Sequence, residues 1–414
     1  MTEKSTKPQL RFAGFDDTWE QRKLLSLCDK FTDGDWIEAK DQSNSGVRLI
    51  QTGNVGVAEY LDKPNNKKWV SKDTFEALHC EEVFEGDILI SRLPEPAGRA
   101  CIVPNIGTKM ITAVDCTIVR VSENISNEFL LQYLSSQKYF GEVNTCLAGG
   151  TRQRISRSNL ADFDIPVPAQ KQEQQAIGHF FRNLDNLITL HQRKYDKLTN
   201  VKKSMLEKMF PKNGSNVPEI RFKGFSDAWE QRKVFELAEK TYGGGTPATS
   251  NEAFWNGNIP WIQSSDILDG KLFGVEPRKH ITQEGLNNSA TQLVPENSIA
   301  IITRVGVGKL AFMPFSYTTS QDFLSLSKLN TEPFFTVYAC YKKLQSELNA
   351  VQGTSIKGIT KDELLAKIIM VPKYAEQQKI GVFFKQLDTL ITLHQRELEK
   401  LKNLKKACLE KMFV

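Results

Sequence analysis

A short stretch of this chain places three arginines beside several hydrogen-bonding side chains. It begins at Thr151, after a Gly-Gly pair, and reads TRQRISR. A planar guanidinium group can bind two acceptors at once, which suits phosphate oxygens or the edge of a guanine base. Arg152, Arg154, Arg157 and Thr151 are therefore candidate nucleic-acid contacts. Taken alone, the stretch is interpreted equally well as a basic surface loop next to a helix that begins at Ser156.

Polar and basic residues recur at equivalent places in the two halves of the chain. Each half has a glutamine-led polar turn after an apolar run, and later a turn with glycine and basic residues. Any one of these side chains is more often structural or solvent-facing, but their equivalent placement favours a shared binding role. The candidates are Gln51, Thr52, Asn54, Arg92 and Arg99 in the first half, and Gln263, Ser264, Ser265, Arg304, Lys309, Thr319, Gln321, Thr354 and Lys357 in the second.

The usual constellations of catalysis are missing from the sequence. The segment RVGVGKL at 304–310 resembles a phosphate-binding loop, but Thr303 stands where a glycine is required and Leu310 follows the lysine. The five histidines form no HExxH motif, and no His-x-Glu precedes a cysteine pair. No glycine-rich strand-turn-helix for an adenosyl cofactor is present. We therefore expect no catalytic residue, no metal ligand and no cofactor bound by this chain.

Length and composition indicate a globular protein of two to three domains. The chain has 414 residues, of which 40% are hydrophobic and 25% charged, and its net charge is +5. Because the N-terminal segment is polar and no run of about 18 apolar residues occurs, we expect a cytoplasmic protein without membrane contact. The seven scattered cysteines contain no CxxC pair, which argues against a disulfide framework and a zinc site.

Two long helical segments of nearly the same sequence must position the candidate loops. Residues 177–210 read IGHFFRNLDNLITLHQRKYDKLTNVKKSMLEKMF, and residues 380–413 read IGVFFKQLDTLITLHQRELEKLKNLKKACLEKMF. Alternating steps of four and three residues select one seam in each, as in a coiled coil. About 34 residues at 1.5 Å each make a rod of roughly 50 Å. The predicted seam is Ile177, Phe181, Leu184, Ile188, His191, Leu198 and Lys202 in the first segment, and Ile380, Phe384, Leu387, Ile391, His394, Leu401 and Lys405 in the second.

The polar residues of this predicted seam occupy matching positions. His191 corresponds to His394, and Lys202 corresponds to Lys405. We interpret all four as residues that set helix register and antiparallel pairing, not as ligands or catalysts. On this interpretation, leucine in place of both lysines would strengthen helix association but permit slipped pairing.

The helical segments belong to a duplication that spans the chain. PQLRFAGFDDTWEQRKL at 8–24 returns as PEIRFKGFSDAWEQRKV at 218–234, and each copy precedes a diverged body and a long helix. The predicted class is α+β, with two α/β domains in a pseudo-two-fold arrangement joined by two long antiparallel coiled-coil helices. The expected divisions are residues 1–168 for the first lead-in and body, 169–217 for the first helix and a linker, 218–372 for the second lead-in and body, and 373–414 for the second helix.

These repeats resemble the specificity subunits of type I restriction-modification systems over essentially the whole chain. The resemblance rests on the two RFxGFxxxWEQRK lead-ins and on the helix starts at 173–193 and 376–396, which share EQQ, FF and LITLHQR. It rests also on GGGTPATSNEAFWNGNIPWI at 243–262, a segment typical of target-recognition domains in that family. Residues 31–50 of the first body depart from this last pattern, so the match is weaker there.

The resemblance implies a non-catalytic subunit for DNA recognition and assembly. Each target-recognition domain would read one half of a bipartite, asymmetric site in double-stranded DNA. The helices would set the spacing and dock two methyltransferase subunits, joined by two motor-nuclease subunits for cleavage. The implied cofactors belong to those partners, namely S-adenosylmethionine for methylation and ATP with Mg for cleavage. Two alternatives remain open, a chain that is itself a nuclease or methyltransferase, and an interaction scaffold without a DNA role.

Overall fold

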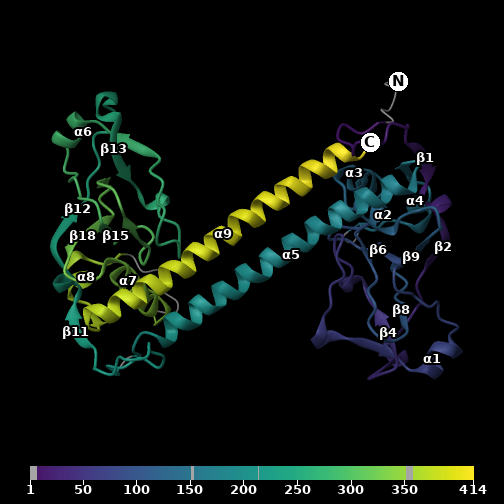
Figure 1. Ribbon diagram of the computed structural model, residues 1–414, viewed down its shortest axis with the longest axis horizontal. Helices are drawn as coiled ribbons and strands as arrows, with labels where there is room; N and C mark the ends of the chain where they lie inside the picture. The colour runs from purple at the N-terminus through teal and green to yellow at the C-terminus, as the bar shows by residue number, and fades with distance from the viewer. Residues whose placement is uncertain (1–6, 151–152, 213, 351–357) are drawn as a thin grey trace. The chain divides into compact units, whose positions relative to one another are not determined.

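The computed structural model describes residues 7–150, 153–212, 214–350 and 358–414, except for the side chains of 349 and 350. The chain divides into two compact units, a first of Met1–Gln192 with Arg396–Val414 and a second of Arg193–Gln395 (Figure 1). Two long helices, α5 (Lys171–Lys208) and α9 (Tyr374–Met412), contribute residues to both units. Within the described ranges, no helix is both long and apolar enough to cross a membrane.

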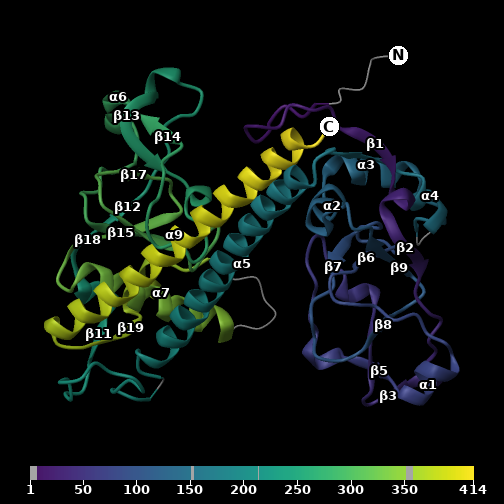
Figure 2. The same ribbon diagram turned by 45° about the vertical axis from the view of Figure 1, so that its right-hand side comes forward.

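Within its described residues, the first unit contains three sheets and four short α-helices. Its central antiparallel sheet has the order β2-β9-β6-β7, and it lies between helices α2 to α4 and a second sheet of order β3-β5-β4-β8 (Figure 2). In the second sheet β4 runs parallel to β8, and a separate pair joins β1 to β10. The elements are β1 (Glu20–Lys23), β2 (Cys28–Asp33), β3 (Gln42–Ser43), β4 (Val47–Ile50), β5 (Lys68–Val70), α1 (Lys72–Ala77), β6 (Ile88–Ser91), β7 (Ala100–Ile102), β8 (Met110–Thr112), β9 (Cys116–Val121), α2 (Asn127–Tyr133), α3 (Gln137–Thr145), α4 (Arg157–Ala161) and β10 (Asp164–Val167).

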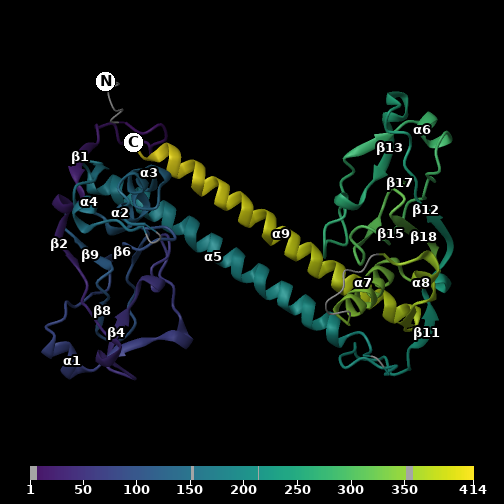
Figure 3. The same cartoon turned by 180° about the vertical axis from the view of Figure 1, so that it is seen from behind.

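The second unit repeats this topology with a different sequence. Its central sheet has the order β12-β18-β15-β16, a second sheet has the order β14-β13-β17, and β11 pairs with β19 (Figure 3). In the second sheet β13 runs parallel to β17, as β4 runs parallel to β8 in the first unit. The elements are β11 (Glu230–Lys233), β12 (Ala238–Gly243), β13 (Trp255–Ile262), β14 (Lys279–Ile281), α6 (Gln283–Asn287), β15 (Ser298–Ile302), β16 (Leu310–Met313), β17 (Thr318–Thr319), β18 (Phe323–Leu329), α7 (Pro333–Ala350), α8 (Lys361–Ala366) and β19 (Ile368–Val371).

The inner strands show why the two bodies fold alike despite their divergence. Strand β6 reads ILIS and strand β15 reads SIAII, and every residue of both is buried. A short, continuous apolar run of this kind suits a strand that is covered on both faces and paired on both edges. The predicted α+β class with two long helices is confirmed.

In each unit the start of one long helix packs against the end of the other. The first unit buries Phe181 and Leu184 of α5 in one cluster with Met412 of α9. The second unit buries Phe384 of α9 with Leu206 of α5. The two helices therefore run antiparallel. Among the predicted seam residues, Ile177, Phe181, Leu184, Ile380, Phe384 and Leu387 are buried, whereas Ile188, His191, Leu198, Lys202, Ile391, His394, Leu401 and Lys405 are half-buried.

Just after the end of each long helix, a phenylalanine packs among aromatic residues that occupy equivalent positions in the two units. Phe413 lies 6.2 Å from Trp19 and 5.6 Å from Phe129 in the first unit, as measured between ring centroids. Phe210 lies 6.0 Å from Trp229 and 5.8 Å from Phe335 in the second. The tryptophan comes from the lead-in in both cases, so packing around the helix ends explains the repeated tryptophan of the WEQRK motif.

The seam lysines have acidic partners that the sequence did not reveal. Lys202 Nζ lies 2.5 Å from Asp388 Oδ1 in the second unit, and Lys405 Nζ lies 2.6 Å from Asp185 Oδ1 in the first. Tyr338 also donates to Asp388, at 2.6 Å, because burial raises the pKa of its hydroxyl far above the usual range and keeps it protonated. These ion pairs argue against the expectation that leucine at these positions strengthens helix association. Leucine would leave a carboxylate without its cation in a site with little solvent.

We expect a double-mutant cycle on Lys202 and Asp388, with Lys202→Met and Asp388→Leu, to give a coupling energy of roughly 1–3 kcal/mol. Both side chains are mostly buried, at 12% and 17% exposure, so solvent screens the pair weakly. Denaturant unfolding of the two single variants, the double variant and the wild type measures the coupling. The Lys405 and Asp185 pair provides the matched cycle, and additive single effects in both cycles would contradict the register role.

Candidate nucleic-acid interface

The described parts of the predicted loops lie at one end of the central sheet in each unit. In the first unit the strand register pairs Asp33 with Thr117 and Ser91 with Cys116, so the chain leaves β2 and β6 at the same end. In the second unit Gly243 pairs with Leu324, and the loop that follows Ile302 lies at the equivalent end. The fold thus gathers segments that are far apart in the sequence.

The two glutamine-led turns have the same geometry. The backbone N–H of Gln51 donates to Asn54 Oδ1 at 3.0 Å, and that of Gln263 donates to Asp266 Oδ2 at 3.0 Å. Asn54 is only 3% exposed, and its amide also donates to Leu61 O at 2.9 Å. The prediction of DNA contact is therefore wrong for Asn54, which builds the turn. The turn leaves Gln51 and Thr52 in the first unit, and Gln263, Ser264 and Ser265 in the second, at least partly accessible.

Arg99 is also a structural residue. Its guanidinium donates to the carbonyls of Val55 at 2.7 Å and Thr52 at 3.0 Å, and to three carbonyls between Leu93 and Pro96 at 2.9 to 3.0 Å. Burial lowers its pKa. With its donors occupied by backbone oxygens, Arg99 links the turn at Gln51 to the hairpin between β6 and β7. These contacts favour a supporting role for Arg99 over DNA contact. Lys309, its counterpart, is half-buried.

Three predicted arginines meet at two aspartates. Arg92 Nη2 lies 3.4 Å and Arg157 Nη1 lies 3.8 Å from Asp33 Oδ2. Arg154 Nη1 lies 4.0 Å from Asp115 Oδ1. Arg92 is mostly buried, at 12% exposure, whereas the side chains of Arg154 and Arg157 are 63% and 48% exposed. The two exposed guanidinium groups can reach an anionic partner. Thr151 and Arg152 lie outside the described residues.

The second unit presents a different set at the equivalent end. Arg304 and Gln321 are exposed. Thr319 is fully buried in β17, opposite Ile262, so the prediction of DNA contact is wrong for it. A threonine has high strand propensity, and here the parallel pairing with β13 decides its place. Thr354 and Lys357 lie outside the described residues.

Two cations of the second unit escaped the prediction. Arg278 is 63% exposed, lies 3.3 Å from Asp266 Oδ1, and donates to Ser265 O at 3.2 Å, so it joins the polar turn. The neighbouring Lys279 lies over the rings of Trp255 and Trp261, at 5.6 and 5.8 Å from their centroids. In the sequence, the run Arg-Lys-His at 278–280 could have indicated these two cations. In the first unit, Trp36 is 72% exposed and was also missed.

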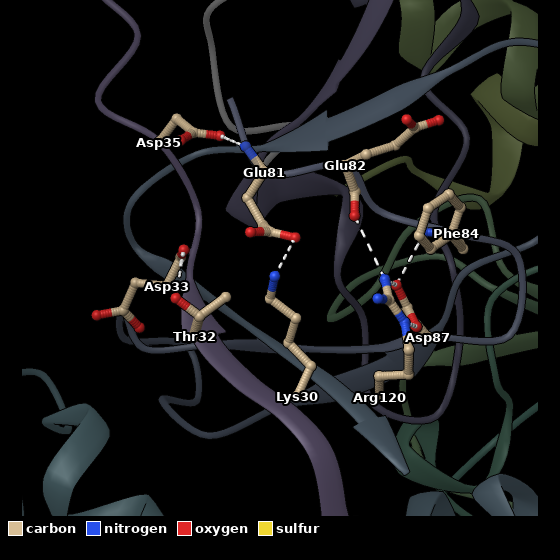
Figure 4. Close-up of polar contacts among 9 residues, drawn as sticks. All are labelled: Lys30, Thr32, Asp33, Asp35, Glu81, Glu82, Phe84, Asp87 and Arg120. Atoms are coloured by element: carbon tan, nitrogen blue, oxygen red, sulfur yellow. Dashed lines mark hydrogen bonds and ion pairs between the residues drawn. The ribbon is translucent and has the colours of Figure 1, made fainter. Parts of the chain in front are cut away.

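In the first unit, an acidic segment from Glu81 to Asp87 forms ion pairs with cations of the central sheet (Figure 4). Lys30 Nζ lies 2.6 Å from Glu81 Oε1, and Arg120 donates to both carboxylate oxygens of Asp87 at 2.8 and 2.7 Å. Asp35 accepts the backbone N–H of Glu81 at 2.9 Å, and burial raises the pKa of its carboxyl group. Figure 4 shows the carboxylate of Asp33 turned away from the Lys30–Glu81 pair. This segment is held to the sheet by its ion pairs.

Two units of one topology, each with its own set of loops, define a protein built from two similar domains with different loops. A family model described as type I restriction modification DNA specificity domain matches residues 16–200 and again residues 226–403. The chain belongs to this family, and the resemblance inferred from the repeats is confirmed.

Individual relatives agree with this assignment. The chain is 24% identical over 404 residues to the specificity subunit assigned to the type I restriction enzyme MjaX of Methanocaldococcus jannaschii, which covers 94% of this chain and 91% of the relative. It is 27% identical over 293 residues to the type I restriction enzyme EcoR124I/EcoR124II specificity subunit of Escherichia coli, covering 68% and 67%. The crystal structure of the type I restriction-modification system S subunit from M. genitalium has the same fold, with a TM-score of 0.65, 16% identity and 99% coverage of both chains. The chain is a specificity subunit with two target-recognition domains, and it is non-catalytic.

Proposed function

We propose that the chain reads a bipartite, asymmetric site in double-stranded DNA, one half with each target-recognition domain. The observation that carries this proposal is the pair of unlike loop sets at the equivalent end of one shared topology. Arg154 and Arg157 are exposed in the first unit. In the second unit, the side chains of Gln263, Ser265 and Arg304 are accessible. Different donors and acceptors select different bases, so the two half-sites differ in sequence.

The proposed recognition domains are residues 1–168 and 218–372, and the segments 169–217 and 373–414 connect them. We assign DNA contact to Gln51, Thr52, Arg154, Arg157, Gln263, Ser264, Ser265, Arg304 and Gln321, and add Arg278 and Lys279. Arginine and lysine supply phosphate contacts as well as base contacts, so the binding weakens with salt.

The long helices are the proposed docking surface for two methyltransferase subunits. Leu187 and Leu190 of α5 are 43% and 45% exposed, and their counterparts Leu390 and Leu393 of α9 are 43% and 50% exposed. Apolar side chains left in contact with water at repeated positions indicate a protein partner. The methyltransferase subunits would supply S-adenosylmethionine chemistry, and two motor-nuclease subunits would supply ATP- and Mg-dependent cleavage. The same repeat on both helices suits two copies of one partner.

Methylation sequencing of cells with and without the chain tests the proposal. We expect deletion to abolish methyladenine at one bipartite motif and to leave the other motifs unchanged. Complementation with Arg154→Ala and Arg157→Ala together should relax one half of that motif, while Gln263→Ala and Arg304→Ala together should relax the other half. An unchanged methylation pattern on deletion would favour the scaffold alternative and overturn the proposal.

A further inference from the structure

One carboxylate of the first unit holds a buried and an exposed arginine together. Asp33 Oδ1 accepts the hydroxyl of Thr117 at 2.8 Å, which fixes the carboxylate at the end of β2. Its other oxygen faces Arg92 at 3.4 Å and Arg157 at 3.8 Å. Arg92 Nη2 is also anchored on Val114 O at 2.7 Å. Asp33 is therefore held by Thr117 and Arg92, whereas Arg157, at 48% exposure, is accessible to solvent.

We propose that Asp33 directs Arg157 toward uncharged base edges and away from phosphates, and so sets how strongly the first unit prefers specific to non-specific DNA. Asp33 acts as a positioning residue, since it does not itself contact DNA. The inference rests on the proposed DNA recognition and names one determinant of its selectivity.

The distances allow this role. A hydrogen bond between an N–H donor and an oxygen has a donor-acceptor distance of about 2.7–3.2 Å, so the 3.8 Å contact of Arg157 is attractive but not a hydrogen bond. Its donors can turn to a DNA acceptor while the carboxylate stays close. A phosphate carries a full negative charge and is repelled by Asp33, whereas the N7 and O6 atoms of guanine are uncharged acceptors. The carboxylate thus penalises phosphate contact more than base contact.

The second unit lacks this carboxylate. Gly243 occupies the last position of β12 opposite Leu324, as Asp33 occupies the last position of β2 opposite Thr117. Thr303 occupies the position of Arg92, since its backbone N–H donates to Asp322 O as that of Arg92 donates to Asp115 O, and the neighbouring Arg304 is exposed. A Cβ atom added to Gly243 would meet no heavy atom within 4 Å, and the backbone there is not left-handed. The chain therefore offers a position where the carboxylate can be introduced.

The test compares three variants of the full chain, assembled with its modification subunit, in DNA binding across a salt series. The probes are a duplex of random sequence and a duplex that carries the methylated motif. Asp33→Asn keeps an acceptor for Thr117, so we expect it to fold, as a thermal melt will check. It should raise affinity for the random duplex about two- to fivefold, the range for one partly exposed ion pair. It should also steepen the salt slope by up to about 0.9, the contribution of one phosphate, without tightening motif binding.

Gly243→Asp should shift the same readouts in the opposite direction, with weaker random-duplex binding and a shallower salt slope. Asp29→Asn is the charge-matched control, because Asp29 is an exposed residue of the same strand. Equal effects of Asp33→Asn and Asp29→Asn would show that net charge alone matters and would overturn the inference. So would an unchanged salt slope in Asp33→Asn. If the wild-type complex bound neither duplex, the proposed function itself would fail, which is a separate outcome.

Discussion

Replacing Arg11 by methionine is expected to lower the free energy of unfolding by about 3–5 kcal/mol, because the change leaves a buried carboxylate without its cation. Arg11 donates to both oxygens of Glu173, at 2.6 and 2.8 Å, and Glu173 is 1% exposed. Trp19 Nε1 approaches the same carboxylate at 3.4 Å. The pair joins the lead-in to the first turn of α5. Its loss would release the lead-in and loosen the aromatic packing around Phe413.

The duplication supplies a matched variant in the second unit. Arg221 donates to both oxygens of Glu376 at 2.7 Å, and Glu376 is also 1% exposed. Arg221→Met should therefore destabilise by a similar amount, and hydrogen exchange of peptides from 8–24 and 218–234 should locate each effect in its own unit. The double variant Arg11→Met/Glu173→Leu should recover most of the lost stability, since it removes both charges. A single variant that costs less than about 1 kcal/mol would contradict the argument.

The sequence predicted the architecture well because the duplication is visible without any structure. Two near-identical helical segments and two lead-ins fix the order of elements, and their apolar spacing identifies residues such as Phe181 and Phe384 that the fold buries. The acid partners of the helix lysines were not predictable in this way. Asp388 lies 186 residues from Lys202, and only the antiparallel packing brings the two together.

The candidate interface was predicted less well, for a physical reason. A polar residue near a turn either faces solvent or satisfies the backbone, and the sequence alone does not separate the two. Asn54 and Arg99 proved to hold the loops in place through their own hydrogen bonds. Thr319 was misplaced because a two-residue parallel pairing has no clear pattern in the sequence. Asp33 was not predicted as a candidate, because its proposed role depends on Arg92 and Arg157, which lie near it in the fold but far from it in the sequence.

The second large effect concerns the proposed spacing of the half-sites. We expect insertion of one helical turn of four residues in each long helix, within 190–201 of α5 and 393–404 of α9, to lengthen the non-specific gap of the methylated motif. Four residues add about 6 Å, which is at most about two base pairs at 3.4 Å each. Both half-sites should stay the same, because the insertions leave every recognition loop intact.

The insertions must be matched, since each helix carries one acid and one lysine of the register pairs. Asp185 and Lys202 bracket the insertion in α5, and Asp388 and Lys405 bracket it in α9, so equal lengthening preserves both ion pairs. Insertion into α5 alone should shift one pair by a full turn and destabilise the helices. The same four residues placed between Ser215 and Asn216, in the linker, provide the control and should leave the gap unchanged. Methylation sequencing reads all three outcomes, and a motif whose half-sites change while its gap stays constant would show that the helices do not set the spacing.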